Sequence, residues 1–241
     1  MVESPADVAW CAADPHFAAD DPAIPLFLRW VEAYIESGAE NLVLLGDLFQ
    51  VWVGDGRSLS DSQRAVLDAA SRAAREGRGV VYLAGNRDYF VEDEASRRGI
   101  LALERWDVSA GSVRLRFEHG DLINTSDRPY LGWREFSRSG AVRALVRALP
   151  ARWSGALARV LERKFSGTNL PYKAYRPGRE LRIWAKGLAG EGIDGAILGH
   201  FHRDAEEEVA GVRVRFVPQF REEGWHLRVD GRGALRLLPF G

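Results

Sequence analysis

The chain has 241 residues, 46% of them hydrophobic, and a formal net charge of −1. This length suits one large domain and is ample for a buried core. The balanced charge gives no indication of a nucleic-acid partner, and the single cysteine, Cys11, excludes a disulfide framework. No apolar run approaches the ~18 residues of a membrane span, and no secretory signal is recognisable at the N-terminus. A reducing, cytoplasmic compartment fits these features best.

Short apolar runs alternate with amphipathic segments in the first half of the chain. Apolar residues recur at helical spacing over 24–37 and 61–76, so we expect helices there, with Asp61 as the N-cap of the second. Three continuously apolar runs predict strands buried on both faces: 8–13, 42–45 and 80–83. This strand–helix–strand–helix–strand order implies a parallel sheet with right-handed crossovers.

The second half of the chain carries mostly strand patterns. Residues 105–110 and 113–117 flank Gly111 and predict a hairpin, and 195–198 is another short apolar run. Further short strands are expected over 212–217, 225–229 and 235–238. The whole predicts an α/β fold in which two sheets pack together with helices outside.

Polar side chains follow five of the predicted strands. They comprise two aspartates, one asparagine and four of the five histidines: Asp14, His16, Asp47, Asn86, His119, His200 and His202. Open α/β sheets bind ligands at the carboxyl ends of their strands. Carboxylate, amide and imidazole donors suit Mn²⁺, Fe²⁺ or Zn²⁺, and the lack of thiolates argues against structural zinc. Seven donors suit two metals about 3.5–4 Å apart that share a carboxylate; the alternative is a histidine-rich cleft without metal.

Five short segments carry a family resemblance: DPH, GDLF, GNRD, HGD and GHFH, in this order. With them, essentially the whole chain resembles the calcineurin-like metallophosphoesterases. The resemblance implies a four-layer αββα sandwich and a dinuclear centre that Asp47 bridges. It assigns one metal to Asp14, His16, Asp47 and His202, and the other to Asp47, Asn86, His119 and His200. A hydroxide between the metals would attack phosphorus in line.

The third motif narrows the expected chemistry. Most relatives of this superfamily have a histidine at the position of Arg87, and that histidine can protonate an alkoxide leaving group. Arginine stays charged and cannot act as a general acid, but it can bind a phosphate through two hydrogen bonds. We therefore predict a leaving group that needs no proton, which makes the substrate a diphosphate. The alternative is that Arg87 replaces the histidine without mechanistic consequence.

GNRD combined with GDLF-x-x-W-x-GD is similar to one branch, the UDP-2,3-diacylglucosamine hydrolase family. This similarity implies cleavage of UDP-2,3-diacylglucosamine to UMP and 2,3-diacylglucosamine 1-phosphate in lipid A synthesis. It also implies Mn²⁺ and a location at the cytosolic face of the inner membrane. The catalytic residues that it implies are Asp47, Asn86, Arg87, His119 and His200. The substrate contacts that it implies are Asn86, Arg87, Asp127, Ser166, Asn169, Lys173 and His200.

Three positions depart from the family pattern. Gln50 stands where the family usually has an acidic residue, and Leu170 stands where it has an asparagine, one position after Asn169. DPH also replaces the more usual DLH. None of these departures removes a predicted metal ligand.

Residues 128–190 lie between the fourth and fifth motifs and predict a helical cap inserted into the single domain 1–241. From Arg128 to Lys186 there are 14 basic and three acidic residues, a net charge of +11, which leaves −12 on the rest of the chain. Apolar residues interleave with the arginines, and Pro150 is expected to separate two helices. Basic amphipathic helices are typical of membrane surfaces. We predict a lid that also contacts the membrane; a solvated cap packed on the sandwich is the alternative.

Other functions remain open at this point. A related enzyme could act on a soluble nucleotide, such as a dinucleoside polyphosphate or a cyclic nucleotide. A non-catalytic scaffold would be marked by lost metal ligands, and all seven are present. A nucleic-acid binder would use the basic segment, but no recognisable reading motif accompanies it.

Overall fold

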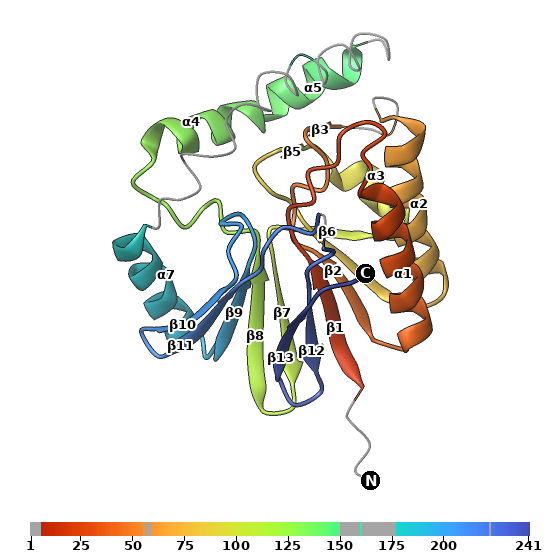
Figure 1. Ribbon diagram of the computed structural model, residues 1–241. Helices are drawn as coiled ribbons and strands as arrows, with labels where there is room; N and C mark the ends of the chain where they lie inside the picture. Colours follow the sequence, from red (N-terminus) through yellow and green to blue (C-terminus); the bar gives the residue numbers. More distant parts are fainter. Residues whose placement is uncertain (1–5, 55, 57–58, 150–159, 161–176, 222) are drawn as a thin grey trace.

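The computed structural model describes residues 6–54, 56, 59–149, 160, 177–221 and 223–241. Two sheets form the centre of the molecule (Figure 1), with strand orders β13-β12-β1-β2-β4-β6 and β10-β11-β9-β8-β7. The first sheet consists of β1 (Asp7–Ala12), β2 (Asn41–Leu44), β4 (Gly79–Leu83), β6 (Leu101–Leu103), β12 (His226–Asp230) and β13 (Leu235–Leu238). The second consists of β7 (Arg105–Ala110), β8 (Val113–Glu118), β9 (Gly195–Leu198), β10 (Ala205–Val209) and β11 (Val212–Phe216). A small separate sheet pairs β3 (Trp52–Val53) with β5 (Asp88–Tyr89).

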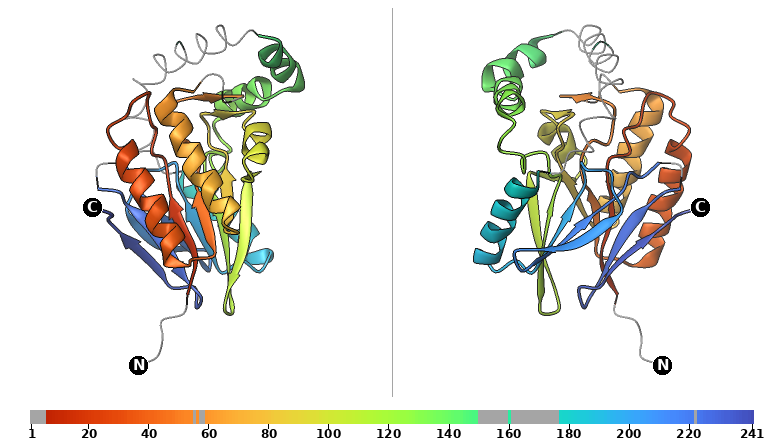
Figure 2. Two further views of the ribbon diagram at one scale, coloured as in Figure 1. Left: turned by 90° about the vertical axis from the view of Figure 1, so that its right-hand side faces the viewer. Right: turned by 60° about the vertical axis from the view of Figure 1, so that its left-hand side comes forward.

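Alternating side chains on the strands build a four-layer αββα sandwich. On β2, Leu42 and Leu44 pack with helices α1 (Ile24–Ser37) and α2 (Asp61–Arg75), whereas Val43 packs against the second sheet. Helix α7 (Gly178–Gly190) covers the outer face of the second sheet through Leu181, Ala185 and Leu188. Figure 2 shows α1 and α2 on one side of the sandwich and α7 on the other.

Most of the predicted elements are confirmed. Strands β1, β2, β4 and β6 pair in parallel, and β7 and β8 form the expected antiparallel hairpin. Helix α1 spans the predicted residues, and so does β9. This parallel arrangement brings the carboxyl ends of several strands to one edge.

The predicted N-cap of α2 was wrong by one residue. Ser60 has the extended backbone of a cap, and its side chain accepts a hydrogen bond of 3.2 Å from the backbone N–H of Gln63. The Gln63 amide oxygen accepts a return bond of 3.1 Å from the Ser60 N–H, which completes a capping box. Asp61 is already the first helical residue, where its charge still favours the positive end of the helix dipole.

The predicted insertion divides into two parts. Helices α4 (Arg128–Ser137) and α5 (Gly140–Ala148) lie beyond the strand ends, next to β3 and β5 (Figure 1). Val142 and Val146 of α5 pack on an apolar cluster that includes Val53 and Phe90. Helix α7 belongs instead to the outer layer of the sandwich, because its apolar face is buried on the second sheet. Pro150 lies outside the described residues, and none of the described helices is long and apolar enough to cross a membrane.

Candidate metal centre

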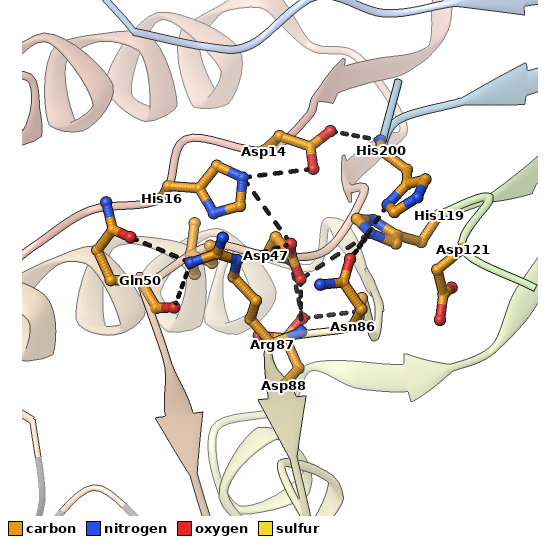
Figure 3. A network of polar contacts seen from close by, with 12 residues as sticks. Asp14, His16, Asp47, Gln50, Asn86, Arg87, Asp88, His119, Asp121 and His200 are labelled. Atoms are coloured by element: carbon orange, nitrogen blue, oxygen red, sulfur yellow. Dashed lines mark hydrogen bonds and ion pairs between the residues drawn. The ribbon is translucent and has the colours of Figure 1, made fainter. Parts of the chain in front are cut away.

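The seven predicted metal ligands converge at one edge of the sandwich. Strand β1 leads into Asp14 and His16, β2 into Asp47, β4 into Asn86, β8 into His119, and β9 into His200 and His202. Both sheets end at this edge, so residues up to 188 positions apart in the sequence meet there. Figure 3 shows six of these side chains pointing toward one another. The positions follow from the strand directions and need no long loops.

One group of donors gathers around Asp14. His202 Nε2 lies 3.3 Å from Asp14 Oδ1 and 3.3 Å from His16 Nε2. His16 Nε2 also lies 3.8 Å from Asp47 Oδ2. The donor atoms of Asp14, His16 and His202 all lie within 4.8 Å of one another, a spacing at which they can bind one metal ion.

A second group gathers around Asn86. Its side-chain oxygen lies 3.2 Å from His119 Nε2 and 3.1 Å from His200 Nδ1. His119 Nδ1 is 2.7 Å from the backbone oxygen of Leu45, which can only accept a hydrogen bond. The Nδ1 atom therefore carries the proton, and Nε2 directs its lone pair toward the centre. Backbone carbonyls commonly orient metal-binding histidines in this way.

Asp47 stands between the two groups. Its Oδ2 atom faces His16 at 3.8 Å, and its Oδ1 atom faces His119 at 3.9 Å. The side chain is fully buried, and its Oδ2 atom accepts no hydrogen bond from the part of the chain that the structure describes. A buried charge in this position requires compensation. Arg87 Nε lies 3.7 Å from the same oxygen, and a cation on either side of Asp47 would add to this compensation. The donor set therefore fits a pair of divalent metals that share this carboxylate.

The backbone of the site is unusual. Five of the seven predicted ligands have a positive φ between 48° and 60°: Asp14, His16, Asp47, His200 and His202. Each residue with a Cβ in this left-handed region costs on the order of 1–3 kcal/mol, and such strain clusters at functional sites. The strain therefore marks this edge independently of the residue types.

Two motif glycines allow the ligand loops to approach closely. A Cβ on Gly46, which has a φ of 78°, would lie 2.6 Å from the backbone nitrogen of Gly85 and 2.7 Å from His119 Nδ1. A Cβ on Gly85 would overlap the carboxylate of Asp47. The lack of a side chain at Gly46 therefore leaves room for the neighbouring loop and His119.

The electrostatics of the rim favour cation binding. Burial would lower the pKa of His119, but Asp47, Asp14 and Asp121 outweigh it and raise the pKa above its ordinary value. Burial, and then the charge of Asp47, raises the pKa of Asp88 to about 6. Neighbouring buried carboxylates contribute to both shifts.

Arg87 lies beside the bridging aspartate. Its side chain is buried, its Nε atom lies 3.7 Å from Asp47 Oδ2, and its Nη1 atom donates to the backbone and side-chain oxygens of Gln50, each at 3.2 Å. Gln50, where the family usually has an acidic residue, therefore orients Arg87 without neutralising it. The guanidinium keeps its positive charge at the edge of the metal site.

No protein-family model matches the chain. A UDP-2,3-diacylglucosamine hydrolase of Stenotrophomonas maltophilia is 35% identical to it, over 92% of this chain and 94% of that protein. Enzymes of the same name from Azotobacter vinelandii and Chromohalobacter salexigens are 32% and 30% identical, each over 95% of this chain. The chain belongs to the UDP-2,3-diacylglucosamine hydrolase family. The predicted family and its hydrolase class are therefore confirmed.

Solved structures of low sequence identity share the fold. A Thermotoga maritima protein superposes with a TM-score of 0.52 at 12% identity, over 96% of this chain and 98% of that one. A hypothetical protein from Pyrococcus horikoshii gives a TM-score of 0.52 at 10% identity, over 96% and 87% of the two chains. They support the predicted fold class and nothing more specific.

In this UDP-2,3-diacylglucosamine hydrolase family member, the predicted substrate contacts are distributed unevenly. Asn86, Arg87 and His200 lie at the candidate centre. Asp127 is the N-cap of α4, where its Oδ1 atom accepts a hydrogen bond of 3.0 Å from the Tyr130 N–H. Three further predicted contacts lie outside the described residues: Ser166, Asn169 and Lys173.

Sequence reasoning missed two buried carboxylates that organise the ligand loops. Asp88 Oδ2 accepts hydrogen bonds of 2.8 Å from the backbone N–H groups of both Asp47 and Gly85, so it joins two loops. Burial would raise the pKa of Asp121, but the charges of His119, Arg134 and His200 lower it below its ordinary value. Both aspartates end a recognised motif, GNRD or HGD, and that position was the available signal.

Proposed function

We propose that this chain hydrolyses the diphosphate of UDP-2,3-diacylglucosamine to UMP and 2,3-diacylglucosamine 1-phosphate, a step of lipid A synthesis. The observation that carries the proposal is the convergence of donor groups on both sides of the buried Asp47. The names of the relatives in three bacterial species support the choice of substrate.

The proposed centre holds two divalent cations, with Mn²⁺ as the expected metal. One cation would be held by Asp14, His16, Asp47 and His202, and the other by Asp47, Asn86, His119 and His200. When bound, such a pair lowers the pKa of a coordinated water and so supplies a nucleophile near neutral pH. Attack of this water on phosphorus would break the bridging P–O bond, and the departing group would leave as a phosphate anion.

Arg87 is proposed to bind and orient the diphosphate. Its guanidinium is held by Gln50 and lies next to Asp47, so it can offer hydrogen bonds to a phosphate oxygen. It cannot donate a proton at neutral pH, because arginine stays charged. A phosphate leaving group needs no proton, which fits a diphosphate better than a phosphomonoester.

The segment 128–190 is proposed to carry the lid over the acylated part of the substrate. A cavity of about 140 Å³ lies between α5 and the β3–β5 sheet. Its apolar lining includes Val53, Phe90 and Val146, and its charged lining comprises Asp93, Arg97, Arg143 and Arg147, with Arg147 paired to Asp93. A lining of apolar and mainly basic side chains suits an amphiphile that carries phosphate. The predicted contacts Ser166, Asn169 and Lys173 belong to the same proposed segment, and Asp127 immediately precedes it.

The same segment is proposed to contact the cytosolic face of the inner membrane. Trp133 and Phe136 on α4 are 47% and 62% exposed, and Leu145 on α5 is 64% exposed. The segment also carries a net positive charge, and each basic residue near an anionic leaflet contributes about 1 kcal/mol. Exposed aromatic and basic side chains together favour the membrane interface.

The proposal is tested by incubating purified protein and Mn²⁺ with UDP-2,3-diacylglucosamine in mixed micelles and measuring UMP. Asp47→Ala should abolish UMP release, whereas the control Asp61→Ala, on a side chain that is 99% exposed, should retain it. Cleavage of a soluble dinucleoside polyphosphate without action on the lipid would show that the substrate is a soluble nucleotide and not the proposed lipid. Wild-type protein inactive on both would contradict the proposed activity.

The lid is tested separately by deleting residues 141–165. We expect the truncated protein to lose activity on acylated, vesicle-borne substrate. Full activity on vesicles after this deletion would contradict the lid role.

A further inference from the structure

Helix α4 of the insertion is tied at its C-terminal end to the loop that carries Asn86. Arg138 Nη2 donates hydrogen bonds to the backbone oxygens of Gly85, at 2.6 Å, and Asp88, at 2.9 Å. These two carbonyls flank Asn86 in the chain. The guanidinium also lies 5.4 Å from the centre of the Tyr89 ring. Charge-assisted bonds to both sides of a short loop restrict how far its middle can move.

The first turns of α4 are tied to the loop that carries His119. The Tyr130 hydroxyl donates to the carboxylate of Asp121, and Arg134 Nε donates to the same oxygen at 3.2 Å. Asp121 follows His119 by two residues and is 5% exposed. Both donors therefore belong to the insertion, and their acceptor, Asp121, is a buried residue of the sandwich.

The two loops supply the same half of the proposed centre. Asn86 Oδ1 lies 3.2 Å from His119 Nε2, so a small shift of either loop changes the spacing of this donor pair. We infer that α4 is a brace that holds Asn86 and His119 at metal-binding distance, with Tyr130, Arg134 and Arg138 as positioning residues. The inference rests on the proposed two-metal centre and adds that the insertion acts on one of its two sites.

The brace predicts a selective effect on metal binding. The Asn86–His119 site is held by α4 through both of its loops. Loss of a residue that orients a metal ligand typically weakens binding about 10–100-fold. Removing a brace contact should therefore weaken the Mn²⁺ site that contains Asn86 and His119 more than the other site.

The variants are Arg138→Gln, which loses the two bonds to the Asn86 loop, and Tyr130→Phe, which loses one hydroxyl and keeps the ring. Arg147→Gln is the matched control. It lies on α5, its side chain is 59% exposed, and its partner is Asp93, which is not a predicted ligand. All three changes act in the same insertion, so a general effect of loosening the cap would appear in every variant.

The experiment titrates the metal-free full-length proteins with Mn²⁺ and follows free Mn²⁺ by electron paramagnetic resonance, without substrate. We expect two sites in wild type and Arg147→Gln, and about tenfold weaker binding at one site in Arg138→Gln and Tyr130→Phe. Hydrogen exchange at the Arg87 amide, which donates to Asp47 Oδ1 at 2.8 Å, should also be faster in Arg138→Gln. Tyr130→Phe keeps the test decisive if Arg138→Gln fails to fold.

Two results would overturn the inference. If the Mn²⁺ affinities of both sites in Arg138→Gln and Tyr130→Phe stay within twofold of wild type, α4 is not a brace. The proposed activity would be unaffected by this result. Equally weakened Mn²⁺ binding in Arg147→Gln would show a general effect of loosening the cap and contradict a specific role of α4. A wild-type protein with two tight sites and no UMP release would instead contradict the proposed function and leave the brace intact.

Discussion

Two histidines of this chain are equally buried but lie in opposite surroundings. His119 and His226 are each 1% exposed. His119 faces carboxylates, and its pKa is raised although burial opposes this. His226 lies between Trp10 and Trp30, with ring centres 5.3 and 5.7 Å away, and burial lowers its pKa to about 4. Burial alone therefore does not determine the charge of a histidine; the neighbouring groups do.

The same contrast separates two regions of the molecule. The rim of strand ends concentrates buried acids and left-handed backbone, both of which are costly in the folded protein. The aromatic cluster around His226 contains regular strand and helix residues with large apolar contacts. We expect changes at the rim to act on function and changes in the cluster to act on stability.

The largest expected effect is the loss of activity in Asp47→Asn. The amide keeps the shape of the side chain but offers one ligating oxygen in place of two, so it cannot bridge. We expect the rate of diphosphate cleavage to fall by about 10³-fold or more. Chemical unfolding of the metal-free variant should give a free energy no lower than that of wild type, because a buried charge near Asp14 and Asp88 is removed. A large loss of stability with activity retained would contradict the expectation that changes at the rim act on function and not on stability.

Gly46→Ala should affect both properties. The added Cβ meets backbone atoms at 2.6 Å and His119 Nδ1 at 2.7 Å, and the φ of 78° is unfavourable for alanine. Left-handed strain and overpacking together should lower the free energy of unfolding by about 3 kcal/mol. Gly77→Ala is the control, because its φ is 80° but nothing lies within 4 Å of the added Cβ. Equal losses in both variants would mean that the close approach at the rim has no energetic consequence.

The aromatic cluster predicts a specific acid sensitivity. The folded pKa of His226, about 4, lies below the ordinary value of 6.5, so the fold favours the neutral ring. Its contribution to stability is complete above pH 6.5 and is lost as the pH falls toward 4, by about 2–3 kcal/mol. In His226→Gln this dependence should vanish. Urea unfolding of both metal-free proteins at pH 7.5 and 4.5 measures it, and a constant difference between them would contradict it.

The smallest expected effect concerns Arg87→His. Histidine can donate a proton to an alkoxide leaving group, which arginine cannot do. We expect a weak phosphomonoesterase activity to appear while diphosphate cleavage falls, because the clamp on phosphate is lost. An assay with p-nitrophenyl phosphate would miss the effect, since its leaving group needs no proton, so an alkyl phosphate is the proper substrate. No gain on alkyl phosphates would leave Arg87 without a role in choosing the leaving group.

Much of the fold and the site was predictable because its signals are local. Apolar periodicity located α1, a short apolar run located β9, and the strand order predicted the edge where the polar residues meet. The cap of α2 was misplaced because serine and aspartate are both good cap residues and only backbone geometry distinguishes them. The division of the insertion was not predictable either. The sequence of an amphipathic helix such as α7 shows that one face is apolar but not which part of the protein that face packs against.

The sequence by itself determined which side chains reach the rim, because each follows a strand whose direction is set by the parallel order. Only the tertiary structure decided how those side chains are held. Asp14 and Asp47 adopt a left-handed backbone there. The bonds of Asp88 to two loops and the contacts of α4 with both ligand loops join distant parts of the chain. Such contacts depend on the packing of the whole molecule and leave no periodic pattern in the sequence.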